Sequence, residues 1–268
     1  VSMKKTILFL FVGLAVLAGA CKSGRSSKKD EKTYQPKDYA FSVPLFPEKP
    51  GEGPAMNVTL SILDTENSGE TAAFFNELLY EGDTPDKYRD SLVEYYRQMY
   101  RDIQVSAEVP EEEHPASFNW EYRETMKVWN PGGGGLVITR DREYYTGGAH
   151  GMHTRQYYVI DAGRPGLLGL EDFFRDPRDP ELRRLIYEAL RSYYGLAERM
   201  PLSEGIFFED EPEPSGNFFI GEEGLGFHWD PYEIAPYSAG QVEISLPWNT
   251  VKPLLKNSAA EILAKFGI

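Results

Sequence analysis

The most distinctive group of chemically capable side chains lies in the stretch 144–151, which reads Tyr-Tyr-Thr-Gly-Gly-Ala-His-Gly. It joins two runs with the character of β-strands, so its glycines stand where a strand pair has to turn or bulge. These residues either pack at a corner or form a rigid rim that faces a ligand. Packing is the alternative that we expect, with a mostly buried His150 ring bonded through a ring nitrogen. The candidate residues of this motif are Tyr145, Thr146, Gly147, Gly148 and His150.

Catalytic and metal-binding patterns are scarce elsewhere in the chain. A zinc site could be assembled from His150 and His153 with Glu171 or Asp161, but the spacing of zinc proteases and a cysteine ligand are both absent. The glycines 132–135 are not followed by the Lys and Ser or Thr of a phosphate-binding loop. Because the chain has 42 acidic residues, any carboxylate pair could be proposed for a glycosidase. We therefore expect no catalytic residue, no metal and no cofactor.

The N-terminus has the pattern of a secretory signal peptide. Lys4 and Lys5 precede an apolar run from Ile7 to Ala20, which is shorter than the roughly 20 residues of a spanning helix. Residues 1–20 are therefore expected to be a signal peptide. From there to residue 37 the chain is rich in Lys, Ser and Gly, which favours a flexible tether, 21–37.

The end of the apolar run, Leu17-Ala18-Gly19-Ala20-Cys21, resembles a bacterial lipobox, with Ala18 in a place where Bacteroidetes-like bacteria tolerate it. The resemblance implies that Cys21, the single cysteine, carries a lipid that anchors the protein to the membrane. It also implies an outer-membrane lipoprotein that faces the periplasm or the cell surface. The alternative is an ordinary signal peptide followed by an incidental thiol, which would be unusual in an oxidising compartment.

The chain is acidic, with a formal net charge of −14, and loss of Lys4 and Lys5 with the leader would make it −16. Such a charge argues against nucleic acid as a partner and favours a cationic one, although it also serves solubility. The aromatic content of 13% provides a large core and leaves aromatic side chains for a binding surface.

The remaining chain predicts an α+β fold in two subdomains, 38–109 and 116–268, with antiparallel sheets and helices packed on one face. Strands are expected over 40–46, 56–63, 117–129, 135–145, 154–160, 217–220, 225–229 and 241–246, with Arg140–Glu143 facing solvent. Helices are expected over 70–80, from Thr84 as N-cap to about residue 103, from Asp179 to Tyr193, and in short pieces over 167–174, 248–256 and 258–266.

Apolar and tyrosine residues recur at helical spacing in the helix expected after Thr84. They are Tyr88, Leu92, Tyr95, Tyr96, Met99 and Ile103. This face could be a sugar-binding platform, but packing against a sheet explains it better.

Three motifs follow one another along the chain, Tyr145–Gly151, Leu170–Phe174 and Tyr232–Tyr237. Together they resemble an extracytoplasmic domain of unknown function shared by RsiV-like anti-sigma factors and PdaC-like peptidoglycan deacetylases, and the resemblance covers about residues 116–256. In that family, RsiV-like members bind lysozyme, and PdaC-like members carry a separate deacetylase domain whose His and Asp motifs are missing here. The resemblance thus implies a ligand-facing module and adds Tyr232 and Tyr237 to the candidate residues.

Two functions follow as expectations. The first is a non-catalytic binding module on a lipid anchor that recognises a cell-wall polymer such as peptidoglycan, or a cationic protein such as lysozyme. The alternative is an envelope hydrolase with an unrecognised carboxylate or histidine site. A hydrolase would need a deep pocket with convergent polar groups near His150.

Overall fold

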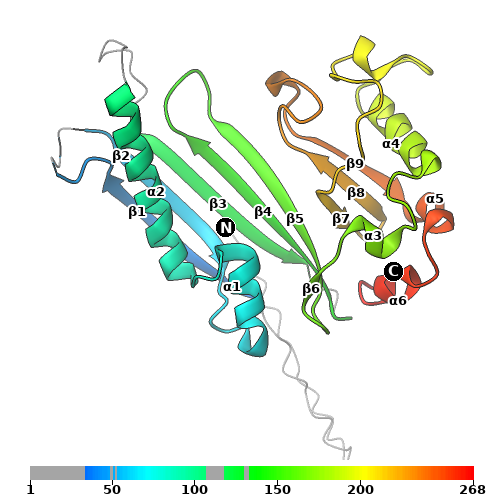
Figure 1. The fold of residues 1–268 in the computed structure, drawn as a ribbon, viewed down its shortest axis with the longest axis horizontal. Helices are drawn as coiled ribbons and strands as arrows, with labels where there is room; N and C mark the ends of the chain where they lie inside the picture. The colour runs from blue at the N-terminus through cyan, green and yellow to red at the C-terminus, as the bar shows by residue number, and fades with distance from the viewer. Residues whose placement is uncertain (1–33, 49–50, 52, 107–117, 130–132) are drawn as a thin grey trace, which may run out of the picture. The chain divides into compact units, whose positions relative to one another are not determined.

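The computed structural model describes residues 34–48, 51, 53–106, 118–129 and 133–268 (Figure 1). The expected signal peptide, the lipidation site Cys21 and His114 lie outside these residues, as does nearly all of the expected tether. Within the described part, no helix has the length and apolar content needed to cross a bilayer.

Six strands form the larger sheet in the order β1 to β6. Every neighbouring pair is antiparallel except β2 and β3, which run parallel. A parallel pair needs a long crossover, and here the chain passes through α1 and α2 between the two strands (Figure 1). The strands are β1 Pro36–Pro44, β2 Ala55–Leu63, β3 Trp120–Trp129, β4 Gly135–Tyr145, β5 Met152–Asp161 and β6 Gly166–Leu167.

The helices α1, Ala72–Tyr80, and α2, Pro85–Ser106, cover one face of this sheet. Alternate residues of β2 are buried beneath them, as period-two alternation requires. As expected, α2 begins after Thr84, whose hydroxyl accepts the amide of Lys87 at 3.4 Å. Most of the tyrosine-rich face of α2 packs in this core, but Tyr95 is 59% exposed and lies off it.

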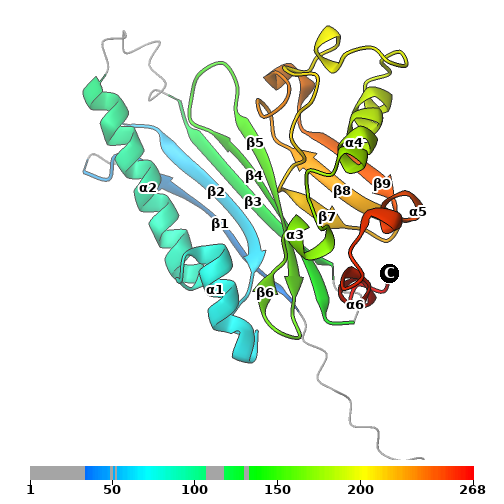
Figure 2. The same cartoon turned by 45° about the vertical axis from the view of Figure 1, so that its right-hand side comes forward.

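A smaller sheet of β7, Phe218–Ile220, β8, Gly224–Trp229, and β9, Val242–Pro247, lies against the other face of β5. All residues of β8 are buried, which is typical of a strand covered on both faces. The far side is covered by helices, with α4 along β9 (Figure 2). These helices are α3 Leu170–Phe173, α4 Pro180–Tyr193, α5 Trp248–Val251 and α6 Ala259–Ala264, with 3₁₀ turns at Gly69–Thr71, Leu202–Glu204, Tyr237–Ala239 and Lys252–Leu254.

The α+β class and the helices on one face of the larger sheet are therefore confirmed, as are most of the expected elements. The apolar stripe of α4 is buried at Leu182, Ile186 and Leu190, but its expected last member, Tyr193, is 53% exposed. The division into 38–109 and 116–268 stays a prediction about folding units. In the structure, both parts contribute strands to one sheet through the pairing of β2 with β3.

The expectation that 140–143 faces solvent is wrong for Arg140, which is 4% exposed and lies beneath α1 and α2. Its Nε donates to Glu124 Oε1 at 2.7 Å, and its other nitrogens donate to the Leu79 carbonyl and the Tyr88 hydroxyl. Glu124 is fully buried, and its Oε2 accepts the hydroxyls of Tyr88 and Tyr122, each at 2.6 Å. A buried ion pair persists when hydrogen bonds satisfy both partners in this way.

Replacing Glu124 by Gln should therefore destabilise the protein by about 3–5 kcal/mol, because Arg140 would remain buried without a counter-charge. Glu121→Gln is the matched control, since Glu121 is exposed on the same strand and its loss should change stability by less than about 0.5 kcal/mol. Urea denaturation followed by circular dichroism measures both. Equal midpoints for the two variants would contradict the assigned role of the buried pair.

Candidate functional site

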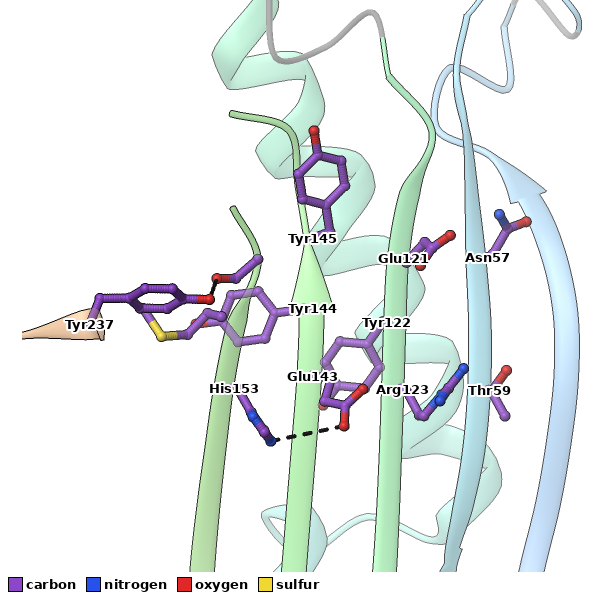
Figure 3. Close-up of a pocket in the computed structure, with 12 residues that line it drawn as sticks. Asn57, Thr59, Glu121, Tyr122, Arg123, Glu143, Tyr144, Tyr145, His153 and Tyr237 are labelled. Atoms are coloured by element: carbon purple, nitrogen blue, oxygen red, sulfur yellow. Dashed lines mark hydrogen bonds and ion pairs between the residues drawn. The ribbon is translucent and has the colours of Figure 1, made fainter. Parts of the chain in front are cut away.

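The face of the larger sheet opposite α1 and α2 is open over β2, β3 and the end of β4, and a groove of about 390 Å³ lies there (Figure 3). Alternation along each strand points polar side chains into this face, because the apolar residues between them point toward the helices. We call it the sheet groove. Its lining residues are Asn57, Thr59, Glu121, Tyr122, Arg123, Glu143, Tyr144, Tyr145, Gly151, Met152, His153 and Tyr237.

Strand register places four of these residues in one row across the groove. Thr59 pairs with Arg123, Arg123 with Glu143, and Glu143 with His153. Neighbouring strands lie about 4.8 Å apart, so the row presents a hydroxyl, a cation, an anion and an imidazole at regular intervals. His153 Nε2 lies 3.9 Å from Glu143 Oε1, while Arg123 and Glu143 are both exposed to solvent.

The motif singled out in the sequence forms the turn between β4 and β5 at one end of the groove. Gly147 and Gly148 have φ angles of +90° and +89°, which side chains disfavour, so the turn requires glycine there. The turn begins at Thr146, and the Tyr145 hydroxyl donates a hydrogen bond across it to the carbonyl of Gly148 at 3.1 Å. The expected turn is therefore confirmed.

Three aromatic rings stand beside the groove, those of His150, Tyr237 and Tyr232. We call them the aromatic rim. The rings of His150 and Tyr237 are stacked with centroids 3.8 Å apart, and Tyr232 lies 5.7 Å from Tyr237. The Tyr237 hydroxyl donates to the Gly151 carbonyl at 2.8 Å (Figure 3). The stack brings together two motifs of the chain, the β4–β5 turn and the segment 232–237.

The expectation of a mostly buried His150 is wrong, because the residue is exposed. Its expected bonding through a ring nitrogen is confirmed, since Nδ1 lies 2.9 Å from the carbonyl of the adjacent Gly151, and the ring also stacks on Tyr237. The turn projects from the end of the sheet, and Tyr237 is the ring that packs on it. The ring of His150 is therefore positioned without being enclosed.

Tyr232 has an unusual backbone for an exposed aromatic residue. Its φ is +74°, in a region that costs a side chain about 1–2 kcal/mol, and it is 51% exposed. Its amide donates to the Ala235 carbonyl at 3.0 Å, which closes the turn that holds this conformation. The strained backbone conformation is therefore found at a residue whose side chain contributes little to the core.

Beneath the rim, a group of charged residues joins the two sheets, and we call it the junction cluster. His228 on β8 is fully buried, with Nδ1 3.1 Å from Glu243 Oε2 and Nε2 3.0 Å from Asp230 Oδ1. Arg155 on β5 pairs with Asp141 at 2.6 Å and with Glu243 at 3.3 Å. Glu243 also accepts the Tyr157 hydroxyl, and Asp230 accepts the Arg155 amide.

The pKa values of the cluster follow from these contacts. Burial alone would lower the pKa of His228, but its hydrogen bonds to Asp230 and Glu243 outweigh that effect and raise the pKa above 6.5. Burial likewise works to raise the pKa of Glu243, but its hydrogen bonds to His228 and Tyr157 and the nearby Arg155 lower it below 4.5. Sequence reasoning missed this cluster. Its one signal is a histidine inside the otherwise apolar strand run 225–229.

The zinc hypothesis finds no support in the described residues, where no three His, Cys, Asp or Glu side chains are grouped as metal ligands. His153 and Asp161 lie near opposite ends of β5, which separates them by roughly 25 Å. Asp161 instead pairs with Lys265 of the C-terminal segment.

Part of the chain matches a known domain family. Residues 171–249 match the family model described as a protein of unknown function, DUF3298. This segment is therefore similar to the DUF3298 domain, and the resemblance to the unknown-function domain of PdaC-like proteins is confirmed. The matched segment begins at α3 and ends in α5, so it contains Tyr232, Tyr237 and His228.

One curated relative is the peptidoglycan-N-acetylmuramic acid deacetylase PdaC of Bacillus subtilis, 23% identical over 174 residues. The match covers 64% of this chain but only 37% of that protein.

Two solved structures share the fold. A DUF3298 family member from Bacteroides fragilis is 22% identical with a TM-score of 0.66, and the match covers 85% of this chain and 95% of that one. A DUF3298 protein from Pseudomonas aeruginosa is 18% identical with a TM-score of 0.55, at 84% and 96% coverage.

Gly148→Ala should lower stability by about 1–2 kcal/mol even though a Cβ there would touch nothing within 4 Å, because the cost comes from the positive φ alone. Gly216→Ala is the control: a Cβ there is equally free, and φ lies outside the left-handed region. This second variant should be neutral or slightly stabilising. Equal melting temperatures for the two variants would show that the turn does not need a left-handed residue at position 148.

Proposed function

We propose that this protein is a non-catalytic binding module of the cell envelope whose sheet groove and aromatic rim hold a cell-wall glycan. The observation that carries the proposal is the placement of two exposed rings, His150 and Tyr232, on either side of the half-buried Tyr237 beside a polar groove. Aromatic faces pack on the apolar faces of sugar rings, while the hydroxyl, amide and charged groups of the groove bind sugar hydroxyls and acetamido groups.

The backbone of Tyr232 adds support. A strained conformation persists only where the surrounding structure enforces it, and such residues cluster at binding sites. Here the strain turns an aromatic ring outward at the rim, where it contributes little to the core. Contact between this ring and a ligand would explain why the strained backbone is retained.

The relative supports the same class of ligand. PdaC is named for its action on peptidoglycan, a polymer of the cell envelope, and it matches this chain over 174 residues. Because the match covers 37% of PdaC, its deacetylase activity is not carried over to this chain. The proposed location, an outer-membrane lipoprotein anchored through Cys21 and facing the periplasm or the surface, rests on the lipobox-like end of the leader.

Two other functions compete. A cationic protein such as lysozyme would suit the net charge of −14 and is therefore included in the test below. A hydrolase would need a carboxylic acid kept protonated by an apolar, enclosed site. Glu121 and Glu143, which line the groove, are both exposed, so the groove fits binding better than acid catalysis.

The test is isothermal titration calorimetry of the purified protein with soluble peptidoglycan fragments and, separately, with lysozyme. Tyr232→Ala should weaken fragment binding about three- to tenfold, the value of one aromatic contact, at an unchanged melting temperature. Tyr95→Ala is the control, since Tyr95 is equally exposed but lies on α2 behind the sheet. A heat of binding with lysozyme but not with the fragments would show that the ligand is a protein and not a glycan. No heat of binding with either would reject the proposal.

A further inference from the structure

We propose that His228 is a positioning residue: its buried, doubly hydrogen-bonded ring latches the segment that carries Tyr232 and Tyr237, so that ligand affinity falls as pH rises. The inference rests on the proposed function, because it concerns the regulation of the same aromatic rim.

The latch follows from the donors and acceptors around the ring. Both ring nitrogens of His228 face carboxylate oxygens, those of Glu243 and Asp230, and the side chain is fully buried. An ionised carboxylate only accepts hydrogen bonds, so both contacts are made only when both ring nitrogens carry protons. Loss of one proton turns one of the two contacts into a repulsion between lone pairs.

Asp230 connects this ring to the rim. Its Oδ1 accepts from His228, from the Arg155 amide at 2.8 Å and from Gln241 Nε2 at 3.2 Å, which fixes the start of the turn to β5. The turn then folds back on Asp230, because Glu233 Oε2 accepts the Asp230 amide and the Glu233 amide donates to the Asp230 carbonyl. Tyr232 lies between these two residues.

The far end of the same segment is held separately, through the bond from the Tyr237 hydroxyl to Gly151. Between these ends, Ile234 and Ala235 are buried and the Ile234 carbonyl accepts a hydrogen bond from the Phe208 amide. The part of the segment that depends on Asp230 is therefore the turn that carries Tyr232. Release of the Asp230 side chain removes the three hydrogen bonds that fix the start of this turn, and so weakens the constraint that keeps Tyr232 in its left-handed conformation.

The charges around His228 set the direction of the effect. Asp141 faces the cluster from β4, Arg155 and the hydroxyl of Tyr157 from β5, and Glu243 from β9, while Asp230 lies at the end of β8. With a charged His228, three carboxylates face two cations. A neutral His228 leaves the same three carboxylates facing Arg155 alone, so the net charge of the cluster changes from −1 to −2 as pH rises.

The pH window follows from the two shifted groups. The pKa of His228 is raised in the folded state, so its stabilisation is complete below 6.5 and is lost as pH rises through the raised value. The pKa of Glu243 is lowered, so its stabilisation is present above 4.5 and is lost as pH falls through the lowered value. The rim is therefore held best between these limits.

The experiment measures binding of peptidoglycan fragments by calorimetry across pH 5 to 9 for wild type and His228→Gln. Wild type should lose about tenfold in affinity as His228 deprotonates, whereas the variant, neutral throughout, should bind weakly with a flat profile. Asp230→Asn keeps an acceptor for the Arg155 amide but removes one carboxylate beside His228. The pH at which half of the affinity change has occurred should therefore be lower in this variant than in wild type. Asp230→Asn serves as the second variant if His228→Gln does not fold. Parallel profiles for wild type and His228→Gln, or an unmoved midpoint in Asp230→Asn, would overturn the latch.

A ligand-free measurement separates the latch from the proposed function. Amide hydrogen exchange of segment 230–237, compared with that of α4 in the same molecule, should accelerate above the pKa of His228 in wild type only. If no fragment binds at any pH, the proposed function fails, and the exchange data still decide whether the latch exists. Equal acceleration in wild type and His228→Gln would reject it.

Discussion

The unequal covering of the larger sheet is the constraint on which the rest of this structure depends. One face is buried by α1 and α2 along β2 to β5, whereas the other is buried only where the smaller sheet and its helices reach, at residues such as Val137 and Val159. On the side away from α1 and α2, strands β4 and β5 therefore change from apolar residues at one end to polar residues at the other. The sheet groove lies where the covering stops, and its polar lining is the solvated remainder of a sheet face.

The local elements could be predicted because their signals are local. The strands β1 and β2, the Thr84 cap and the glycine turn at 147–148 each depend on a few adjacent residues and were predicted. The parallel pairing of β2 with β3 has no local signal, because an exposed residue such as Thr59 gives the same sequence pattern whichever strand pairs with β2.

The buried charges were missed for a related reason. Arg140 reads as a surface residue in a charged run until register places it beside Glu124, whose charge compensates it in the core. His228 and Glu243 likewise become partners only when β8 and β9 pair directly at these positions. The exposure of His150 depends on how far the β4–β5 turn projects, which composition does not encode. The residues of the aromatic rim were thus visible in the sequence as motifs, whereas the row of residues across the groove and the junction cluster required the tertiary structure.

The crossover between β2 and β3 also has a consequence for how the chain acquires its structure. Strands β3, β4 and β5 follow each other through short connections, so they can form early as an antiparallel meander, as can the β1–β2 hairpin. Joining the two requires closure of the chain from Leu63 to Trp120, which is slow because entropy is lost before any contact compensates for it. Until then β2 and β3 each present an unpaired edge with apolar residues on one side. That interval is when the nascent protein is most exposed to aggregation and most dependent on chaperones.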